Sequence, residues 1–268
     1  MSEHASLFTS PPDRLLGLLE NHLPHSLLLF RKLQYLRHRC ADSALPEVIY
    51  TSNRGKLSDS DSDAEPEAFT VLFINTSSSG STAMYVYSTI EDGRNDDADE
   101  SEYERQLDVI TQELLKLRRV VEGHMGKEVP DIVVLGGLNS VTRRLWEKTG
   151  RIAGRSSSSY DNWILDMINV PDLGSSLPDG MVWDTVDLED CREPFRKQGL
   201  ARKVSAKLLR ERVDEFGPGG LAIAHVAPDN LASRAMCKSL GGYPTTSVTW
   251  VNFNLADVVE PAAQNGHV

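Results

Sequence analysis

The sequence predicts an α/β fold, because segments with helically spaced leucines alternate with short runs of β-branched and aromatic residues. The clearest alternation lies in the last ninety or so residues, which read as strand, turn, helix, strand, helix and strand. The 268 residues, 40% hydrophobic and 25% charged, match a globular chain with one large domain or two small ones. These values exclude a fibrous repeat and a wholly disordered chain.

The first ninety residues begin with two leucine-rich segments, 12–23 and 24–40, which predict a helical hairpin. A short β-type run at 47–51 follows. The runs 69–76 and 82–90, rich in β-branched and aromatic residues, predict a β-hairpin. The acidic, serine-rich stretch 58–67 cannot bury apolar surface and is expected to be a mobile loop, or less often a phosphorylation site.

A long amphipathic helix is predicted over 103–121, where leucines, isoleucine and valine recur on one face. The next segment, DIVVLGGLNSVTRRLWEKTG, predicts a buried strand, a tight turn at Gly136–Gly137 and a helix capped near Asn139 or Ser140. The turn lacks the glycine fingerprints of dinucleotide and Walker sites, so a plain turn is favoured over a phosphate site. Together these elements predict one amino-terminal α/β unit.

A stretch rich in proline, glycine and serine at 169–180 is typical of a linker. We therefore expect an amino-terminal α/β domain at 1–168 and a second domain at 177–268. The elements predicted for the second domain are a strand beginning at Met181, a helix at 200–216, a strand at 220–228, a helix at 231–240 and a strand at 245–255.

Charge and cysteine content limit the function classes. The net charge of -11 and the pI of about 5.1 argue against nucleic acid as a partner. Cys40, Cys191 and Cys237 show neither a disulfide framework nor a zinc spacing, so no metal site is predicted. No apolar run approaches the length of a membrane span, and no secretory signal is recognisable, so a cytoplasmic protein is expected, with mitochondria as the alternative.

One segment has the opposite charge. Residues 192–212 contain eight basic residues and two acidic ones, a net charge of +6. Such a helix is often only a solvated face. Here the string Arg196-Lys197-Gln198-Gly199-Leu200-Ala201 precedes the helix, and Gly199 leaves the backbone open to a ligand. Unpaired N–H groups at the helix start and the helix dipole then favour a pyrophosphate group.

The string resembles the acyl-CoA-binding motif Arg/Gln-x-x-Gly-x-Gly/Ala of the GNAT N-acyltransferase superfamily. A second motif of that superfamily is similar to 228–243, in which Asn230 opens a helix that ends at Leu240-Gly241. The segments LLENHLPHSLLLFRKL and LPDGMVW further resemble the glycine N-acyltransferase-like branch. The two motifs cover 191–243, whereas the branch resemblance extends over most of the chain.

The resemblance implies a mixed sheet flanked by helices and an N-acyltransferase that transfers an acyl group from acetyl-CoA or another acyl-CoA to a small amine such as glycine. It implies that the cofactor is bound by Arg196, Lys197, Gln198, Gly199, Leu200, Ala201 and Asn230. The alternative is a catalytically inactive CoA-binding or interaction protein of the same fold. Acyl-CoA and the amine are the expected partners, with neither nucleic acid nor membrane, and the oligomeric state stays open.

No catalytic residue is assigned. Cys237 stands where the family usually places a tyrosine as general acid, and a buried cysteine is more often packing. His225 in the strand at 220–228 is a candidate base, although one histidine in an apolar strand more often has a structural role. The acidic residues before the cradle match no family position securely: Asp187, Glu189, Asp190 and Glu193.

The second domain is short for the implied fold. The superfamily core runs strand, two helices and three more strands before the cradle, which takes roughly 55 residues. The sequence offers twelve, 184–195. Either the amino-terminal unit supplies the strands, or the acyltransferase domain has lost its middle and has an open sheet edge. The second explanation is favoured, because LPDGMVW already resembles a domain start.

Overall fold

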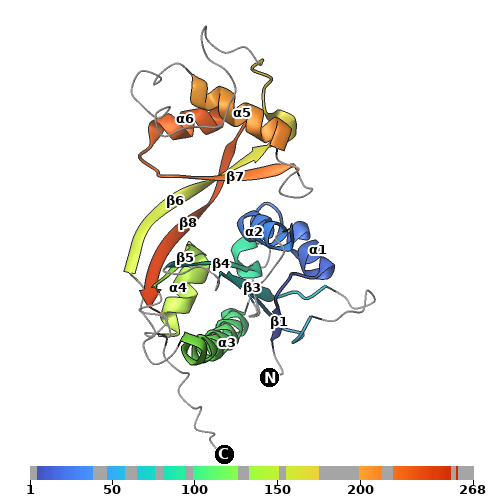
Figure 1. Cartoon of the computed structure of the whole chain (residues 1–268), viewed down its shortest axis with the longest axis vertical. Coiled ribbons are helices and arrows are strands. Elements are labelled where there is room, and N and C mark those ends of the chain that lie inside the picture. Colours follow the sequence, from blue (N-terminus) through green and yellow to red (C-terminus); the bar gives the residue numbers. More distant parts are fainter. Residues whose placement is uncertain are drawn as a thin grey trace, which may run out of the picture. The chain divides into compact units, whose positions relative to one another are not determined.

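The computed structural model describes residues 5–38, 47–57, 65–75, 81–93, 99–125, 133–150, 155–174, 199–212, 220–254 and 258 (Figure 1). Contacts within the chain divide it into two compact units. Unit 1 comprises residues 1–161 and 246–268, and unit 2 comprises residues 162–245. The strands β6 (Arg155–Asp166) and β8 (Tyr243–Asn254) each have residues in both units.

In the described part of unit 1, ten further elements precede β6. They are β1 (Ser6–Phe8), α1 (Asp13–Asn21), α2 (Leu27–His38), β2 (Val48–Ser52), β3 (Phe69–Ile74), β4 (Ser81–Ser88), the 3-10 helix η1 (Thr89–Asp92), α3 (Glu100–Met125), β5 (Val133–Asn139) and α4 (Ser140–Lys148). The predicted helical hairpin, β-hairpin and long helix are confirmed. Most of the expected mobile loop, 58–64, lies outside the described residues.

The eight strands of the described residues form one mixed sheet in the order β1-β2-β3-β4-β5-β8-β6-β7, where β7 is Leu221–Val226. The pairs β1–β2, β2–β3 and β3–β4 are antiparallel. The pair β4–β5 is parallel, and the pair β5–β8 is antiparallel. The parallel pair is joined through α3, as a crossover connection requires. The α/β class with a mixed sheet flanked by helices is therefore confirmed.

Helices cover both faces of the sheet of unit 1, with α1 and α2 on one side and α3 and α4 on the other (Figure 1). Every residue of β2 and β3 is buried, which explains why these strands lack polar alternation. The core under α3 contains Leu72, Ile110 and Trp146, all nearly inaccessible. The buried indole N–H of Trp146 donates to the Thr111 hydroxyl at 3.1 Å, so this polar group is satisfied.

The prediction of a turn at Gly136–Gly137 is wrong. Both glycines lie inside β5 and are paired on both sides, Gly137 with Tyr85 of β4 and with Trp250 of β8. A Cβ atom at Gly137 would lie 3.2 Å from the Trp250 ring, so the glycine makes room for this indole. The predicted cap is confirmed at Asn139, whose side chain accepts a hydrogen bond from the Val141 N–H at 2.9 Å.

The contacts of β8 make the observed units differ from the expected domains 1–168 and 177–268. Seven residues of β8 pair with β5, from Val248 opposite Asn139 to Asn254 opposite Val133. Val251 joins the hydrophobic core under α3. Residues 246–268 are consequently part of unit 1, although the sequence analysis placed them in the second domain.

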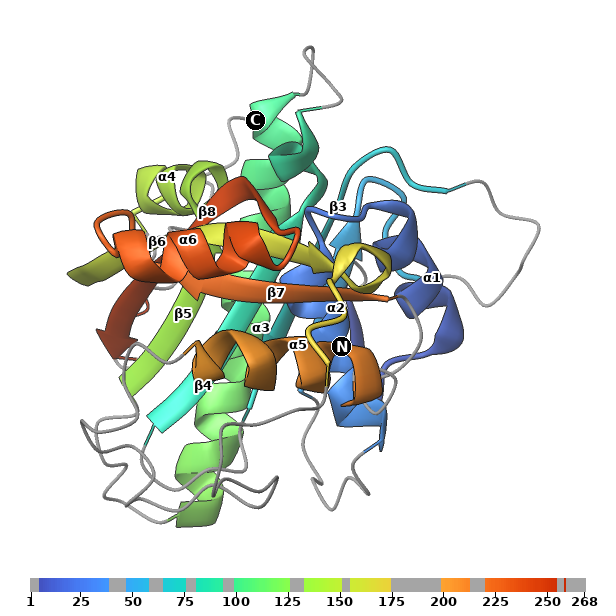
Figure 2. The ribbon, with the colours of Figure 1, turned by 90° about the horizontal axis from the view of Figure 1, so that it is seen from above.

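Unit 2 contains the short helix η2 (Met167–Asn169), α5 (Leu200–Arg212), β7 and α6 (Leu231–Ser239), together with the ends of β6 and β8. Helices α5 and α6 lie on one face of β7 (Figures 1 and 2). The hydrophobic core of unit 2 contains Leu165 of β6, Ala206 of α5 and Leu240. The predicted helices and strands after residue 199 are confirmed, with α5 described as far as Arg212, whereas the strand expected at Met181 lies outside the described residues.

Glu91 introduces a pH dependence into unit 1. Its Oε1 accepts hydrogen bonds from the Thr142 hydroxyl at 2.5 Å and from the Ser88 N–H at 3.3 Å. Burial is the main cause that raises the pKa of this carboxyl from 4.5 to about 8. Between these values the folded protein keeps the proton and the unfolded chain loses it, so the free energy of unfolding falls as the pH rises.

We predict that Glu91→Gln removes this pH dependence, because an amide oxygen can accept both hydrogen bonds without a charge. The slope removed is at most about 1.4 kcal/mol per pH unit, so the variant gains most at pH 8 and little at pH 4. Thermal denaturation followed by circular dichroism from pH 4 to pH 9 measures it, with the exposed Glu20→Gln as control. Equal pH profiles for wild type and Glu91→Gln would contradict the prediction.

Candidate functional site

Part of the cradle that the sequence predicts, Gly199 to Ala201, lies at the start of α5. Gly199 immediately precedes the helix and has a φ of +73°, which favours glycine. Its carbonyl accepts the hydrogen bond of the first helical turn from the Lys203 N–H at 3.2 Å. The N–H groups of Leu200, Ala201 and Arg202 therefore have no acceptor within the helix. Among the residues that the structure describes, no neighbouring atom lies within 4 Å of a Cβ built on Gly199.

The basic residues of α5 serve several purposes. Arg202 donates through Nη2 to the Ser239 carbonyl at 3.0 Å, at the end of α6. Arg210 pairs with Asp172 at 3.2 Å, and Lys207 pairs with Glu211 at 2.5 Å. These three residues therefore have contacts within unit 2. Arg196, Lys197 and Gln198 of the predicted cradle lie outside the described residues.

The first turn of α3 differs from the first turn of α5 in its charge and in its capping residue. In unit 1, residues 6–88 run strand, two helices and three strands before α3, the order expected before a superfamily cradle. Yet Asp99 caps α3 by accepting a hydrogen bond from the Ser101 N–H at 3.0 Å, and hydrogen bonds from Ser101 lower the Asp99 pKa. Glu100 and Glu102 add charge in the first turn. A phosphate is repelled there, whereas a glycine opens α5.

Asn230 is the N-cap of α6. Its Oδ1 accepts a hydrogen bond from the Ser233 N–H at 3.0 Å, and its carbonyl accepts one from the Arg234 N–H at 3.0 Å. Its side-chain NH₂ group makes no hydrogen bond within the described part of the chain. One side chain can thus cap the helix through oxygen and present a donor through nitrogen.

The glycines at the end of the second motif have a packing reason. Gly241 has a φ of +82°, and a Cβ atom there would lie 2.7 Å from the Asn169 carbonyl oxygen. A Cβ atom at Gly242 would lie 2.9 Å from the Cys237 carbonyl oxygen. Both contacts are shorter than side chains tolerate, so glycine lets the chain turn closely from α6 into β8.

The two candidates for proton transfer are both held within unit 2. His225 Nδ1 lies 2.8 Å from Asn162 Oδ1, and because an amide oxygen only accepts, Nδ1 carries the proton. Cys237 is buried against Trp163 and Val226, and burial raises the pKa of its thiol. Both observations agree with structural roles. The acidic candidates at 187–193 lie outside the described residues.

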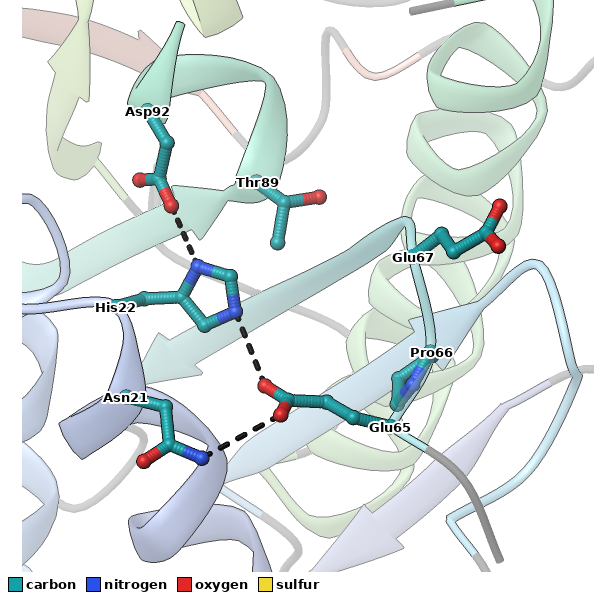
Figure 3. Close-up of a pocket in the computed structure, with 7 residues that line it drawn as sticks. All are labelled: Asn21, His22, Glu65, Pro66, Glu67, Thr89 and Asp92. Carbon is teal, nitrogen blue, oxygen red and sulfur yellow. Dashed lines mark hydrogen bonds and ion pairs between the residues drawn. The ribbon is translucent and has the colours of Figure 1, made fainter. Parts of the chain in front are cut away.

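The structure contains a pocket of about 310 Å³ in unit 1 that the sequence analysis missed. It is lined by Asn21, His22, Glu65, Pro66, Glu67, Thr89 and Asp92 (Figure 3). The lining comes from three separate segments, so no local motif marks it. Among the described residues, no group of histidine, cysteine and acidic side chains is arranged to hold a metal ion.

Comparisons with known proteins identify the class. An X-ray structure of a Drosophila protein matches 94% of this chain and 99% of its own, with a TM-score of 0.50 and 13% identity, which shows a shared fold. Residues 3–163 match the family described as the acyl-CoA N-acyltransferase verG N-terminal domain. The chain therefore has the fold of the GNAT N-acyltransferase superfamily. More particularly, it belongs to the verG N-terminal domain family.

The matched span coincides with most of unit 1 and ends within β6.

A search of curated proteins gives no match. In the described part of the chain, no helix combines the length and apolar character needed to cross a membrane.

We predict that substitutions of Asn230 reveal its capping role through stability alone, without any ligand. Asn230→Ala removes the cap and is expected to lower the free energy of unfolding by about 1 kcal/mol, whereas Asn230→Asp keeps an acceptor and the stability. Urea denaturation measures the difference. Equal stability of the alanine variant and wild type would show that the cap contributes nothing.

Proposed function

We propose that this protein is an acyl-CoA-dependent N-acyltransferase that holds the CoA pyrophosphate at the start of α5. The observation that carries the proposal is the helix start at Gly199, with its left-handed backbone, inside a segment of net charge +6. The backbone N–H groups from Arg196 to Ala201 would bind the phosphates, and Arg196 and Lys197 would add charge-assisted contacts. Asn230 would donate its side-chain NH₂ group to the cofactor beyond the phosphates.

The sheet order supports a complete acyltransferase rather than a shortened one. Strand β6, which begins in the amino-terminal region, lies between β8 and β7 in the sheet. The strands that seemed to be missing before residue 199 are thus available from the first 168 residues, as the first of the two explanations requires. This arrangement also avoids an open edge at β8, which has a partner on each side.

The proposed reaction is attack of an amine nitrogen on the thioester carbonyl. A base takes the ammonium proton, the C–N bond forms, and backbone N–H groups stabilise the tetrahedral oxyanion. The C–S bond then breaks, and the CoA thiolate leaves and takes up a proton. Acetyl-CoA or a longer acyl-CoA is the donor, and a small amino acid such as glycine is the acceptor that the branch resemblance favours.

The first test is isothermal titration of the full chain with CoA and acetyl-CoA. We predict binding in the micromolar range, weakened by salt because pyrophosphate contacts are charged. Absence of binding at millimolar ligand by a folded sample would refute the proposal.

A matched pair of variants tests the position of the site. Ala201 is exposed in the first turn of α5. We predict that Ala201→Glu weakens CoA binding by about tenfold or more through repulsion of the phosphates, while the same carboxylate stabilises the helix start. Ala201→Gln has the same shape without the charge and is expected to bind nearly as wild type. Equal losses in both variants would indicate steric damage and place the phosphates elsewhere.

An inactive CoA-binding protein is the second candidate. It is favoured by Cys237, which stands at the family's tyrosine position, is buried, and has a pKa raised by burial. Thiol release with a panel of amines separates the two candidates. CoA binding with no thiol release would assign the inactive function, and release above the hydrolysis rate with any amine would assign the enzyme.

A further inference from the structure

The described part of the chain contains one run of elements twice. Residues 100–166 form α3, β5, α4 and β6, and residues 200–254 form α5, β7, α6 and β8, so helix, strand, helix and strand follow each other in both. The later elements also agree in length. Helices α4 and α6 have nine residues each, and strands β6 and β8 have twelve each. The second segment therefore repeats the first in order and in size.

The helices α4 and α6 agree residue by residue. Each has an asparagine N-cap, Asn139 or Asn230, whose side chain accepts a hydrogen bond from a backbone N–H of the first turn. Each is followed by a glycine with positive φ, Gly150 at +67° and Gly241 at +82°. A distance of 91 residues separates the two asparagines, and the same distance separates the two glycines. The start and the end of the two helices are thus in register.

The ends of both helices have the same hydrogen bonds. The Gly150 N–H donates to the Glu147 carbonyl at 3.0 Å, and the Gly241 N–H donates to the Lys238 carbonyl at 3.1 Å. In both helices, the residue before the glycine donates to the carbonyls three and four residues earlier. This agreement in cap, length and final turn is expected for two copies of one segment.

The two copies differ at the start of their first helix. Gly-Leu-Ala at 199–201 leads into α5, whereas Asp-Glu-Ser at 99–101 leads into α3. The Asp99 side chain accepts a hydrogen bond from the Ser101 N–H at 3.0 Å, so a carboxylate of the chain already uses a donor of the α3 start. The charge that a phosphate would bring is supplied there by the protein.

The amino-terminal copy is also closed beside α4. Glu91 belongs to η1, in the segment that leads from β4 into α3. Its Oε1 accepts a hydrogen bond at 2.5 Å from the hydroxyl of Thr142, a buried residue in the first turn of α4. The resemblance to the GNAT motifs implies that the cofactor contacts the segment before the first helix and the start of the second. In the amino-terminal copy these two parts are hydrogen-bonded to each other.

We propose that residues 100–166 are a second copy of the cofactor-binding half of the fold that is closed to acyl-CoA, so that the chain binds one CoA, at α5. The inference rests on the function proposed above, which assigns CoA to the copy that begins at α5. Asp99 and Glu91 are the residues that close the amino-terminal copy, because they place carboxylates of the chain at both parts that would contact the cofactor.

Isothermal titration of the full chain with CoA counts the sites. We expect one class of sites and a stoichiometry of about one CoA per chain. Two sites per chain would overturn the inference and leave the proposed function standing. Absence of binding would refute the proposed function, and this inference with it.

Equivalent positions in the two copies provide a matched pair of variants. Ser101 and Ala201 are the second residues of α3 and α5, and both are exposed. Ala201→Glu is expected to weaken CoA binding by about tenfold or more, whereas Ser101→Glu adds the same charge to the closed copy and is expected to bind within about twofold of wild type. Equal weakening by both variants, or weakening by Ser101→Glu alone, would overturn the inference. Urea denaturation checks that both variants are folded.

Discussion

The antiparallel pairing of β5 with β8 is the interaction on which the rest of the structure depends. It joins Val133–Asn139 to residues far along the chain and continues the sheet of unit 1 into β8, β6 and β7. Gly137 makes room in this pairing for the Trp250 indole, which also meets the Tyr85 ring edge-on, with ring centres 5.8 Å apart. Without this ladder β5 would have a free edge, and Val251 would leave the core under α3.

Elements whose pattern lies within their own segment were predictable from the sequence. Strands whose position depends on partners far along the chain were not. The helices α1, α2 and α3 and the β3–β4 hairpin carry their own periodicity, so their positions followed from the sequence. Strand β6 begins with arginine and four serines, which lack a strand pattern, and its place depends on β8 and β7. The Gly136–Gly137 pair looks like a turn locally, and only partners on both sides extend it into a strand.

The same distinction applies to the sites. The proposed α5 site is a local string that a sequence motif can mark, and the glycine at 199 has a left-handed backbone. The pocket of unit 1 joins His22 to Glu65 and Asp92, which lie 43 and 70 residues further along the chain. No motif spans such separations. The contrast between the two helix starts adds information, because the order of elements expected before a cradle precedes α3, which has an acidic cap, whereas the glycine stands at the start of α5.

The position of β8 has a consequence for synthesis of the protein. Residues 133–139 of β5 emerge from the ribosome long before residues 248–254, which are their partners. Unit 1 therefore waits with an unpaired strand edge while the whole of unit 2 is translated, and this long-range pairing is slow to form. A chain released or cut before residue 248 lacks the β8 residues that pair with β5, so the β5 edge is exposed to other chains.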